Sequence, residues 1–190
     1  SRRALIGGSL AVAGARALPA RAAPDPLALH RGIALWPWFS LTTEYPPPRT
    51  DYAWPPFQAG RPIPTPRDLG QLADLGFDFV RLPLDPGPFV AFTGTRRTEL
   101  FDALSAAIDA ILAAGLRVVV NVQANAATHH YTPDAFYGSD RALLFSAYRD
   151  LVGALARLCA RKDAGQVALE PVNEPPQACG ALAWNRVQNR

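Results

Sequence analysis

Apolar residues along this chain form short continuous runs that alternate with longer segments in which they recur every three or four positions. The short runs, bounded by glycine or proline, predict buried strands at 30–36, 77–83, 116–123 and from 167 onward. The periodic segments predict helices at 65–76, 99–114 and 140–162. Strands and helices therefore alternate along the domain. This order predicts an α/β fold with a parallel sheet and right-handed crossovers.

Two architectures fit this alternation. A TIM (β/α)8 barrel is favoured, because polar residues that can bind a ligand or take part in a reaction follow successive strands. A Rossmann-type open sheet is the second choice. No Gly-x-Gly-x-x-Gly or Walker pattern follows a strand, which lowers the dinucleotide and nucleotide interpretations.

The fourth predicted strand ends in a polar pair. Residues 167–176 read V-A-L-E-P-V-N-E-P-P, so an apolar run closes on Asn173 and Glu174 before two prolines. We expect both side chains at the carboxyl end of a strand, which is where α/β folds bind ligands and carry out chemistry.

The sequence Asn173-Glu174-Pro175 resembles the signature of glycoside hydrolase family 5, the cellulase-like retaining glycosidases, many of which also carry a glutamate at the position of Glu170. Segment 75–83, L-G-F-D-F-V-R-L-P, resembles the second-strand segment of that family. The resemblance implies that Glu174 is the general acid/base, that Asn173 holds the 2-hydroxyl of the sugar, and that Arg81 hydrogen-bonds the nucleophilic carboxylate. It implies a carbohydrate substrate and neither a metal nor an organic cofactor.

Further sugar contacts are expected at the same end of the barrel. Many family members end the third strand with Asp-x-His, whereas this chain has Gln123, which can still hydrogen-bond hydroxyl groups. Segment 37–66 is too rich in proline for regular structure, and its rings could stack on sugar faces. The predicted substrate-binding residues are therefore Asn173, Arg81, Gln123, Trp36, Trp38 and His130. His129 and His130 have no carboxylate at ligand spacing, and no metal site is predicted.

The length of 190 residues bounds the functional interpretation. A complete barrel needs roughly 250 residues, and the predicted elements reach only the fourth strand. We expect residues 24–190 to be the N-terminal part of the barrel. Glu44, Glu99 and Glu170 offer no suitable second carboxylate, so the fragment alone is expected to be inactive. A non-catalytic carbohydrate-binding barrel and another retaining glycosidase family of the same clan stay open as alternatives.

The excess of positive charge lies mainly in the first 23 residues. They hold four arginines and no acidic residue, while the whole chain has 19 Lys+Arg against 16 Asp+Glu, a net charge of +3. The net charge of the remaining residues is close to zero, so they give no indication of the basic surface that nucleic-acid binding requires. Residues 1–23, with paired Arg2 and Arg3 before a short apolar run, predict a twin-arginine-like export signal and a periplasmic or extracellular location. That run is too short to span a membrane.

Cys159 and Cys179 could pair or stay as thiols, and the oligomeric state is left open.

Overall fold

The computed structural model of the chain describes residues 27–57, 63–175 and 182–189. One four-stranded sheet has the order β1-β2-β3-β4, and every neighbouring pair is parallel. Its strands are β1 (Gly32–Ala34), β2 (Phe79–Leu84), β3 (Arg117–Val122) and β4 (Val167–Glu170). Sequential neighbours in a parallel sheet require a crossover between each pair, and this agrees with the alternation predicted from the sequence.

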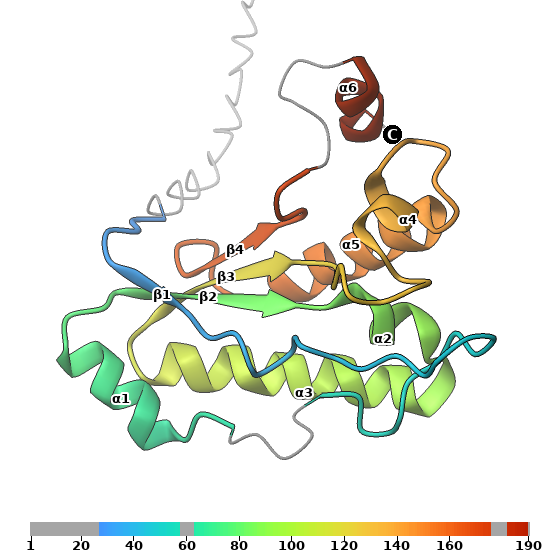
Figure 1. Cartoon of the computed structure of the whole chain (residues 1–190). Helices are drawn as coiled ribbons and strands as arrows, with labels where there is room; N and C mark the ends of the chain where they lie inside the picture. Colours follow the sequence, from blue (N-terminus) through green and yellow to red (C-terminus); the bar gives the residue numbers. More distant parts are fainter. Residues whose placement is uncertain (1–26, 58–62, 176–181, 190) are drawn as a thin grey trace, which may run out of the picture.

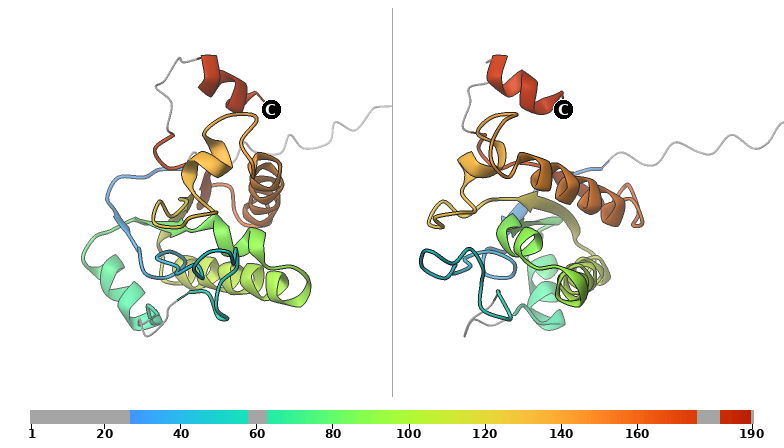
Figure 2. Two further views of the ribbon diagram at one scale, coloured as in Figure 1. Left: turned by 45° about the vertical axis from the view of Figure 1, so that its right-hand side comes forward. Right: turned by 90° about the vertical axis from the view of Figure 1, so that its right-hand side faces the viewer.

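The crossovers are helical. The main connecting helices are α1 (Pro66–Asp74), α3 (Gly94–Ala113) and α5 (Phe145–Cys159), and shorter helices follow as α2 (Pro86–Ala91), α4 (Pro133–Tyr137) and α6 (Leu182–Gln188). Figure 1 shows α1 and α3 along one side of the sheet, with the strands pointing toward α2, α4 and the loop that follows β1. Figure 2 shows α1 and α6 at opposite ends of the molecule.

Local sequence fixes where several helices begin. Thr65 caps α1 in a reciprocal capping box with Asp68. Asp85 and Thr132 cap α2 and α4, and each is followed by proline in the first turn. Proline suits that position because its missing N–H has no partner there in any helix. The short helices α2 and α4 were not predicted from periodicity, since each is shorter than two turns.

The core lies between the sheet and the helices. Alternate residues of β2 and β3 are fully buried, and they pack with apolar residues of the helices: Val80, Leu82, Leu84, Val118, Val120 and Val122 with Leu69, Leu104, Ile108, Ile111, Leu151 and Leu155. Burying a side chain of this size contributes about 1.5–3 kcal/mol. Arg81 and Asn121 occupy intervening positions of β2 and β3, and Glu170 of β4 is paired with Asn121, so these three polar residues lie on the other face of the sheet.

Two strands differ from their predicted bounds. β1 is shorter than 30–36, and β4 ends at Glu170, four residues before Glu174. Beyond Glu170 the regular pairing with β3 stops, and the chain bends at residues 173 and 174. The backbone N–H of Asn173 then donates to the carbonyl of Val122 at 3.0 Å. Asn173 and Glu174 therefore lie on a turn attached to the end of β3 rather than on the strand itself.

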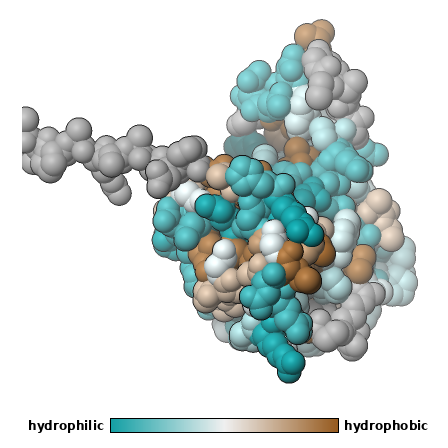
Figure 3. All heavy atoms as spheres, turned by 90° about the vertical axis from the view of Figure 1, so that its left-hand side faces the viewer, coloured by the Kyte–Doolittle hydropathy of each residue, from teal (hydrophilic) through white to brown (hydrophobic). Residues whose placement is uncertain are grey.

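The β1 edge of the sheet has no strand partner on its outer side among the described residues. Figure 3 shows hydrophobic patches between hydrophilic residues on the face of the molecule at that side. Exposed apolar side chains of this region include Ile33 and Leu75. No helix in the described parts of the chain combines the length and hydropathy needed to cross a bilayer.

Candidate functional site

Three polar side chains meet on the polar face of the sheet. The guanidinium of Arg81 donates from Nε to Glu170 Oε2 at 2.8 Å and from Nη2 to Glu170 Oε1 at 2.7 Å. Nη2 also donates to Asn173 Oδ1 at 2.7 Å. The hydrogen bond to Glu170 raises the pKa of Arg81, and the charge of Glu174 adds to this shift. The arginine is therefore held as a fixed cation at the end of β4.

This contact orients the amide of Asn173. Its oxygen accepts from a guanidinium that can only donate, so its NH2 group remains as a donor. Asn173 also lines the neighbouring pocket. The family resemblance implies a nucleophilic carboxylate as a partner of Arg81, and that prediction stays untested; among the described residues the carboxylate partner of Arg81 is Glu170.

A pocket of about 270 Å³ opens at the carboxyl ends of the strands. Four residues predicted from the sequence line it: Trp36, Gln123, Asn173 and Glu174. Trp36 is 40% exposed, so part of its ring is accessible. The side-chain oxygen of Gln123 is buried and has no hydrogen-bond partner among the described residues. The pocket thus combines an aromatic wall with a carboxyl group, an amide and an unpaired acceptor.

Glu174 has a backbone φ of +43°. L-residues rarely adopt this left-handed region, and strain of this kind concentrates at functional sites. The turn is held by the hydrogen bond of Asn173 to the end of β3 and by Pro175, which follows. The strained backbone position therefore belongs to a residue that lines the pocket.

Two predicted contact residues lie elsewhere. Trp38 is 6% exposed and stacks on Phe39, with ring centroids 5.9 Å apart, so its ring belongs to the core. Burial of so large a ring stabilises the fold more than exposure at a rim would. His130 is outside the pocket lining, and its ring packs edge-on against Tyr131 at 4.7 Å. Neither of these two predicted side chains lines the pocket.

Asp85 is a pocket residue that the sequence reasoning did not select. Its side chain is 0% exposed; Oδ1 accepts from the Gly87 N–H at 3.0 Å and Oδ2 accepts from the Thr42 hydroxyl. Burial raises the pKa of Asp85 to about 6. Asp-Pro-Gly begins two residues after the predicted strand 77–83 and is a helix-capping signal that could have located this residue.

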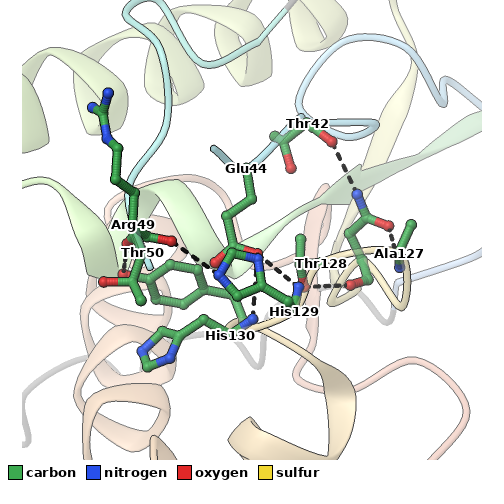
Figure 4. Close-up of polar contacts among 10 residues, drawn as sticks. Thr42, Glu44, Arg49, Thr50, Ala127, Thr128, His129 and His130 are labelled. Atoms are coloured by element: carbon green, nitrogen blue, oxygen red, sulfur yellow. Dashed lines mark hydrogen bonds and ion pairs between the residues drawn. The ribbon is translucent and has the colours of Figure 1, made fainter. Parts of the chain in front are cut away.

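Glu44 joins the loop after β1 to the loop after β3 (Figure 4). Its Oε2 accepts from the backbone N–H of His129 at 2.7 Å, from that of His130 at 3.2 Å, and from His129 Nδ1 at 2.8 Å. His129 Nε2 lies 2.9 Å from the carbonyl oxygen of Arg49. Both ring nitrogens of His129 therefore face oxygen atoms that can accept a hydrogen bond.

The same two loops are joined at further points. Asn125 Nδ2 donates to the Thr42 carbonyl at 3.0 Å, and the Tyr131 hydroxyl donates to the Thr50 carbonyl at 2.8 Å. The rings of Tyr52 and Tyr131 stack at 5.4 Å. In the described residues before α1, segment 37–66 is irregular, as predicted. Long-range contacts hold this part of the chain in place, and it supplies Ser40 and Leu41 to the pocket.

Some sequence predictions concern residues that the structure does not describe. Residues 1–23, the predicted export signal, lie outside the described residues, and so does Cys179, which leaves the disulfide prediction untested. Cys159 is half-buried in α5. Among the described residues, no group of three or more His, Cys, Asp or Glu side chains is placed to hold a metal ion.

Comparison with known proteins adds a family. Residues 43–190 match the family model described as cellulase, glycosyl hydrolase family 5. No curated protein sequence matches the chain.

Solved structures of similar fold include three enzymes of this family, each with a TM-score of 0.57. A trimodular endoglucanase of subfamily 4 is 19% identical, with 83% of this chain and 28% of that chain covered. A Prevotella bryantii B14 enzyme in complex with a xyloglucan tetradecasaccharide is 19% identical, with coverage of 76% and 41%. A lichenase mutant from Caldicellulosiruptor sp. F32 in complex with cellotetraose is 16% identical, with coverage of 88% and 46%.

These neighbours confirm the predicted fold. At this level of identity the likeness is one of architecture, a (β/α)8 barrel, of which this chain forms about the first four β/α units. The chain spans less than half the length of each of the three neighbours.

Proposed function

This chain belongs to glycosyl hydrolase family 5, the cellulase family, and from that premise we propose that it forms part of the active site of a retaining glycosidase that cleaves β-linked glucans. Glu174 is the general acid/base, and the pocket at the strand ends holds a sugar unit. The observation that carries the proposal is that Glu174 and Asn173 line one pocket together with Gln123 and Trp36. Carboxyl ends of barrel strands are where such folds carry out chemistry.

The proposed reaction has two displacements. In the first, a carboxylate nucleophile bonds to the anomeric carbon, the glycosidic C–O bond breaks, and protonated Glu174 gives its proton to the leaving oxygen. In the second, ionised Glu174 takes a proton from a water molecule, whose oxygen bonds to the anomeric carbon and displaces the carboxylate. The sugar leaves with its original anomeric configuration.

The neighbouring groups support this role. Because Arg81 occupies the amide oxygen of Asn173, the amide NH2 is the part that can donate to the sugar 2-hydroxyl. The unpaired oxygen of Gln123 offers an acceptor to another hydroxyl. A hydroxyl-rich ligand satisfies both groups, whereas an apolar ligand would leave them without partners at a cost of about 1–3 kcal/mol each.

We place the nucleophile outside these 190 residues. The other glutamates have different partners or positions: Glu170 binds Arg81, Glu44 holds the loop at His129, and Glu99 lies in α3. On this proposal the chain alone hydrolyses nothing, and the complete protein that contains the whole barrel is the active enzyme.

The test compares this chain with the complete protein on a linear mixed-linkage β-glucan, with reducing-sugar release and NMR of the first-formed anomer as measurements. We expect hydrolysis by the complete protein alone, with the β-anomer formed first. Binding of the glucan without cleavage by the complete protein would identify a carbohydrate-binding barrel instead. Hydrolysis by the isolated chain would place the nucleophile within it.

We also propose that residues 1–23 direct export. The support is the pair Arg2 and Arg3 ahead of a short apolar segment that contains no acidic residue. Fusion of residues 1–23 to a folded reporter tests it in bacterial cells. Export that is lost when both arginines become lysine supports the proposal, and a reporter retained in the cytoplasm contradicts it.

A further inference from the structure

The two non-glycine residues with positive φ in the described parts of the chain both line the same pocket. They are Glu174, at +43°, and Leu41, at +59°. A leucine in this region is unusual, because its side chain crowds the backbone there. Such a conformation persists only where its surroundings impose it. The contacts on either side of Leu41 therefore explain why it is there.

The residues that flank Leu41 are both held inward. The Ser40 hydroxyl donates to the Trp36 carbonyl, and the Thr42 hydroxyl donates to the carboxylate of Asp85. The Thr42 carbonyl accepts from Asn125 at 3.0 Å. Ser40 and Thr42 are both buried, whereas Leu41 between them is 48% exposed. The loop thus turns two polar side chains into the protein and displays the apolar one at the pocket.

This is the reverse of the pattern that folding alone favours, since a half-exposed leucine in a strained conformation adds little to stability. A ligand in the pocket would change that, because it would bury the exposed half of the side chain. Sugar rings present C–H groups on their faces, and apolar side chains cover such faces well. Trp36 lines the same pocket and offers a second apolar surface.

We propose that Leu41 is a specificity-determining residue that packs against the sugar unit in the pocket and excludes units that carry a branch. The proposal rests on the glycosidase function argued above and narrows its substrate class to unbranched β-glucan at this position. The pocket, at about 270 Å³, lies just below the range of about 300–1,000 Å³ for small-molecule sites. It suits one sugar unit, and a branch would have to pass the fixed leucine.

The test uses the complete protein and two substrates, an unbranched cello-oligosaccharide and a xylosyl-branched xyloglucan oligosaccharide of equal backbone length. The variants are Leu41→Ala, Leu41→Gly and, as a matched control, Leu75→Ala, which truncates another exposed leucine at the end of α1. Leu41→Gly also relieves the positive φ, so its melting temperature is expected to equal or exceed that of the wild type.

We expect Leu41→Ala to raise KM for the unbranched substrate about fivefold with kcat nearly unchanged, since about half a leucine side chain of contact is lost. The ratio of kcat/KM for branched over unbranched substrate should rise about tenfold in both Leu41 variants and stay constant in Leu75→Ala. A purely structural role would shift the melting temperature without moving this ratio.

If the ratio of kcat/KM for branched over unbranched substrate stays unchanged in both Leu41 variants while Glu174→Gln abolishes hydrolysis of the oligosaccharides, the inference about Leu41 is overturned. The proposed function is left standing by this result. A wild-type preference for the branched substrate also overturns it. Failure of the wild-type protein to hydrolyse either oligosaccharide removes the proposed function, and this inference with it.

Discussion

Arg81 on β2 donates two hydrogen bonds, of 2.8 and 2.7 Å, to Glu170 at the end of β4, although β3 lies between the two strands. Strands two places apart in a sheet are roughly 10 Å from each other, a distance that these two long side chains can span together. The pair therefore bridges three strands on the polar face. It also fixes Asn173, the residue that precedes the proposed acid/base.

Removing this arginine should affect both stability and catalysis. In Arg81→Met the Glu170 carboxylate and the Asn173 amide oxygen lose their donor, which should lower the free energy of unfolding by about 1–3 kcal/mol. The amide of Asn173 becomes free to rotate, so kcat should also fall. Denaturant unfolding and steady-state kinetics of the complete protein measure the two effects.

The chain offers a matched control in Arg49, which forms a similar two-point contact with Asp51 at 2.8 and 2.6 Å but on the exposed surface. Exposed pairs contribute little, so Arg49→Met should unfold nearly as the wild type does. Equal losses in the two variants would contradict a special role for the Arg81 contact.

Asp85 should make stability depend on pH. Its pKa is raised from an ordinary 3.8 to about 6 by burial, so the folded state binds the proton more tightly than the unfolded state. The stabilising contribution is complete below about pH 4 and is lost as pH rises to about 6, a change of roughly 3 kcal/mol. In Asp85→Asn this contribution is absent.

The measurement is the free energy of unfolding of the wild type and of Asp85→Asn between pH 4 and pH 7. As pH rises across this range, the free energy of unfolding of the wild type should fall by roughly 3 kcal/mol relative to that of the variant, because the variant has no carboxylate to ionise at position 85. Parallel curves for the two proteins would show that Asp85 does not titrate in this way.

The contact between Glu44 and His129 should control how firmly the two pocket loops are held together. Glu44→Ala removes the acceptor of the backbone N–H groups of His129 and His130 and of the His129 ring. Hydrogen exchange at these two amides should accelerate at least tenfold, since about 1.4 kcal/mol of protection corresponds to a factor of ten. Glu99→Ala, on the exposed side of α3, is the control. Unchanged exchange at both amides would show that the loops are held by other contacts.

Gln123 should bind substrate at the expense of stability. Its buried oxygen has no hydrogen-bond partner in the part of the chain that the structure describes, and a sugar hydroxyl can supply one. Gln123→Ala should therefore raise KM about tenfold while the protein melts no lower than the wild type. An unchanged KM would remove Gln123 from the binding site.

Much of the fold was readable because periodicity and local signals are short-range. The parallel order of the strands and the start of α1 at Pro66 follow directly from such patterns. The end of β4 was predicted four residues too late, because the apolar run continues through Val172 although the regular pairing with β3 ends at Glu170. The short helices α2 and α4 are set by caps rather than by periodicity.

The pocket was predicted only in part, because several of its contacts join residues far apart in the sequence. The carboxylate of Glu44 meets amides 85 and 86 positions away, and no local pattern encodes that. The sequence places Trp38 in an aromatic loop, but it cannot say which rings turn inward to the core. The positive φ of Leu41 likewise arises from the contacts of Ser40 and Thr42, which only the folded chain brings about.

The most direct test of the central claim is the effect of Glu174→Gln on two substrates of the complete protein, one with a poor leaving group and one with a good leaving group. If Glu174 protonates the leaving oxygen, kcat/KM for an unactivated oligosaccharide should fall by about 10²–10⁴, while kcat/KM for a nitrophenyl glycoside, which needs no acid, stays near the wild-type value. Equal losses on both substrates, or no loss on either, would contradict the assignment of Glu174 as the general acid/base.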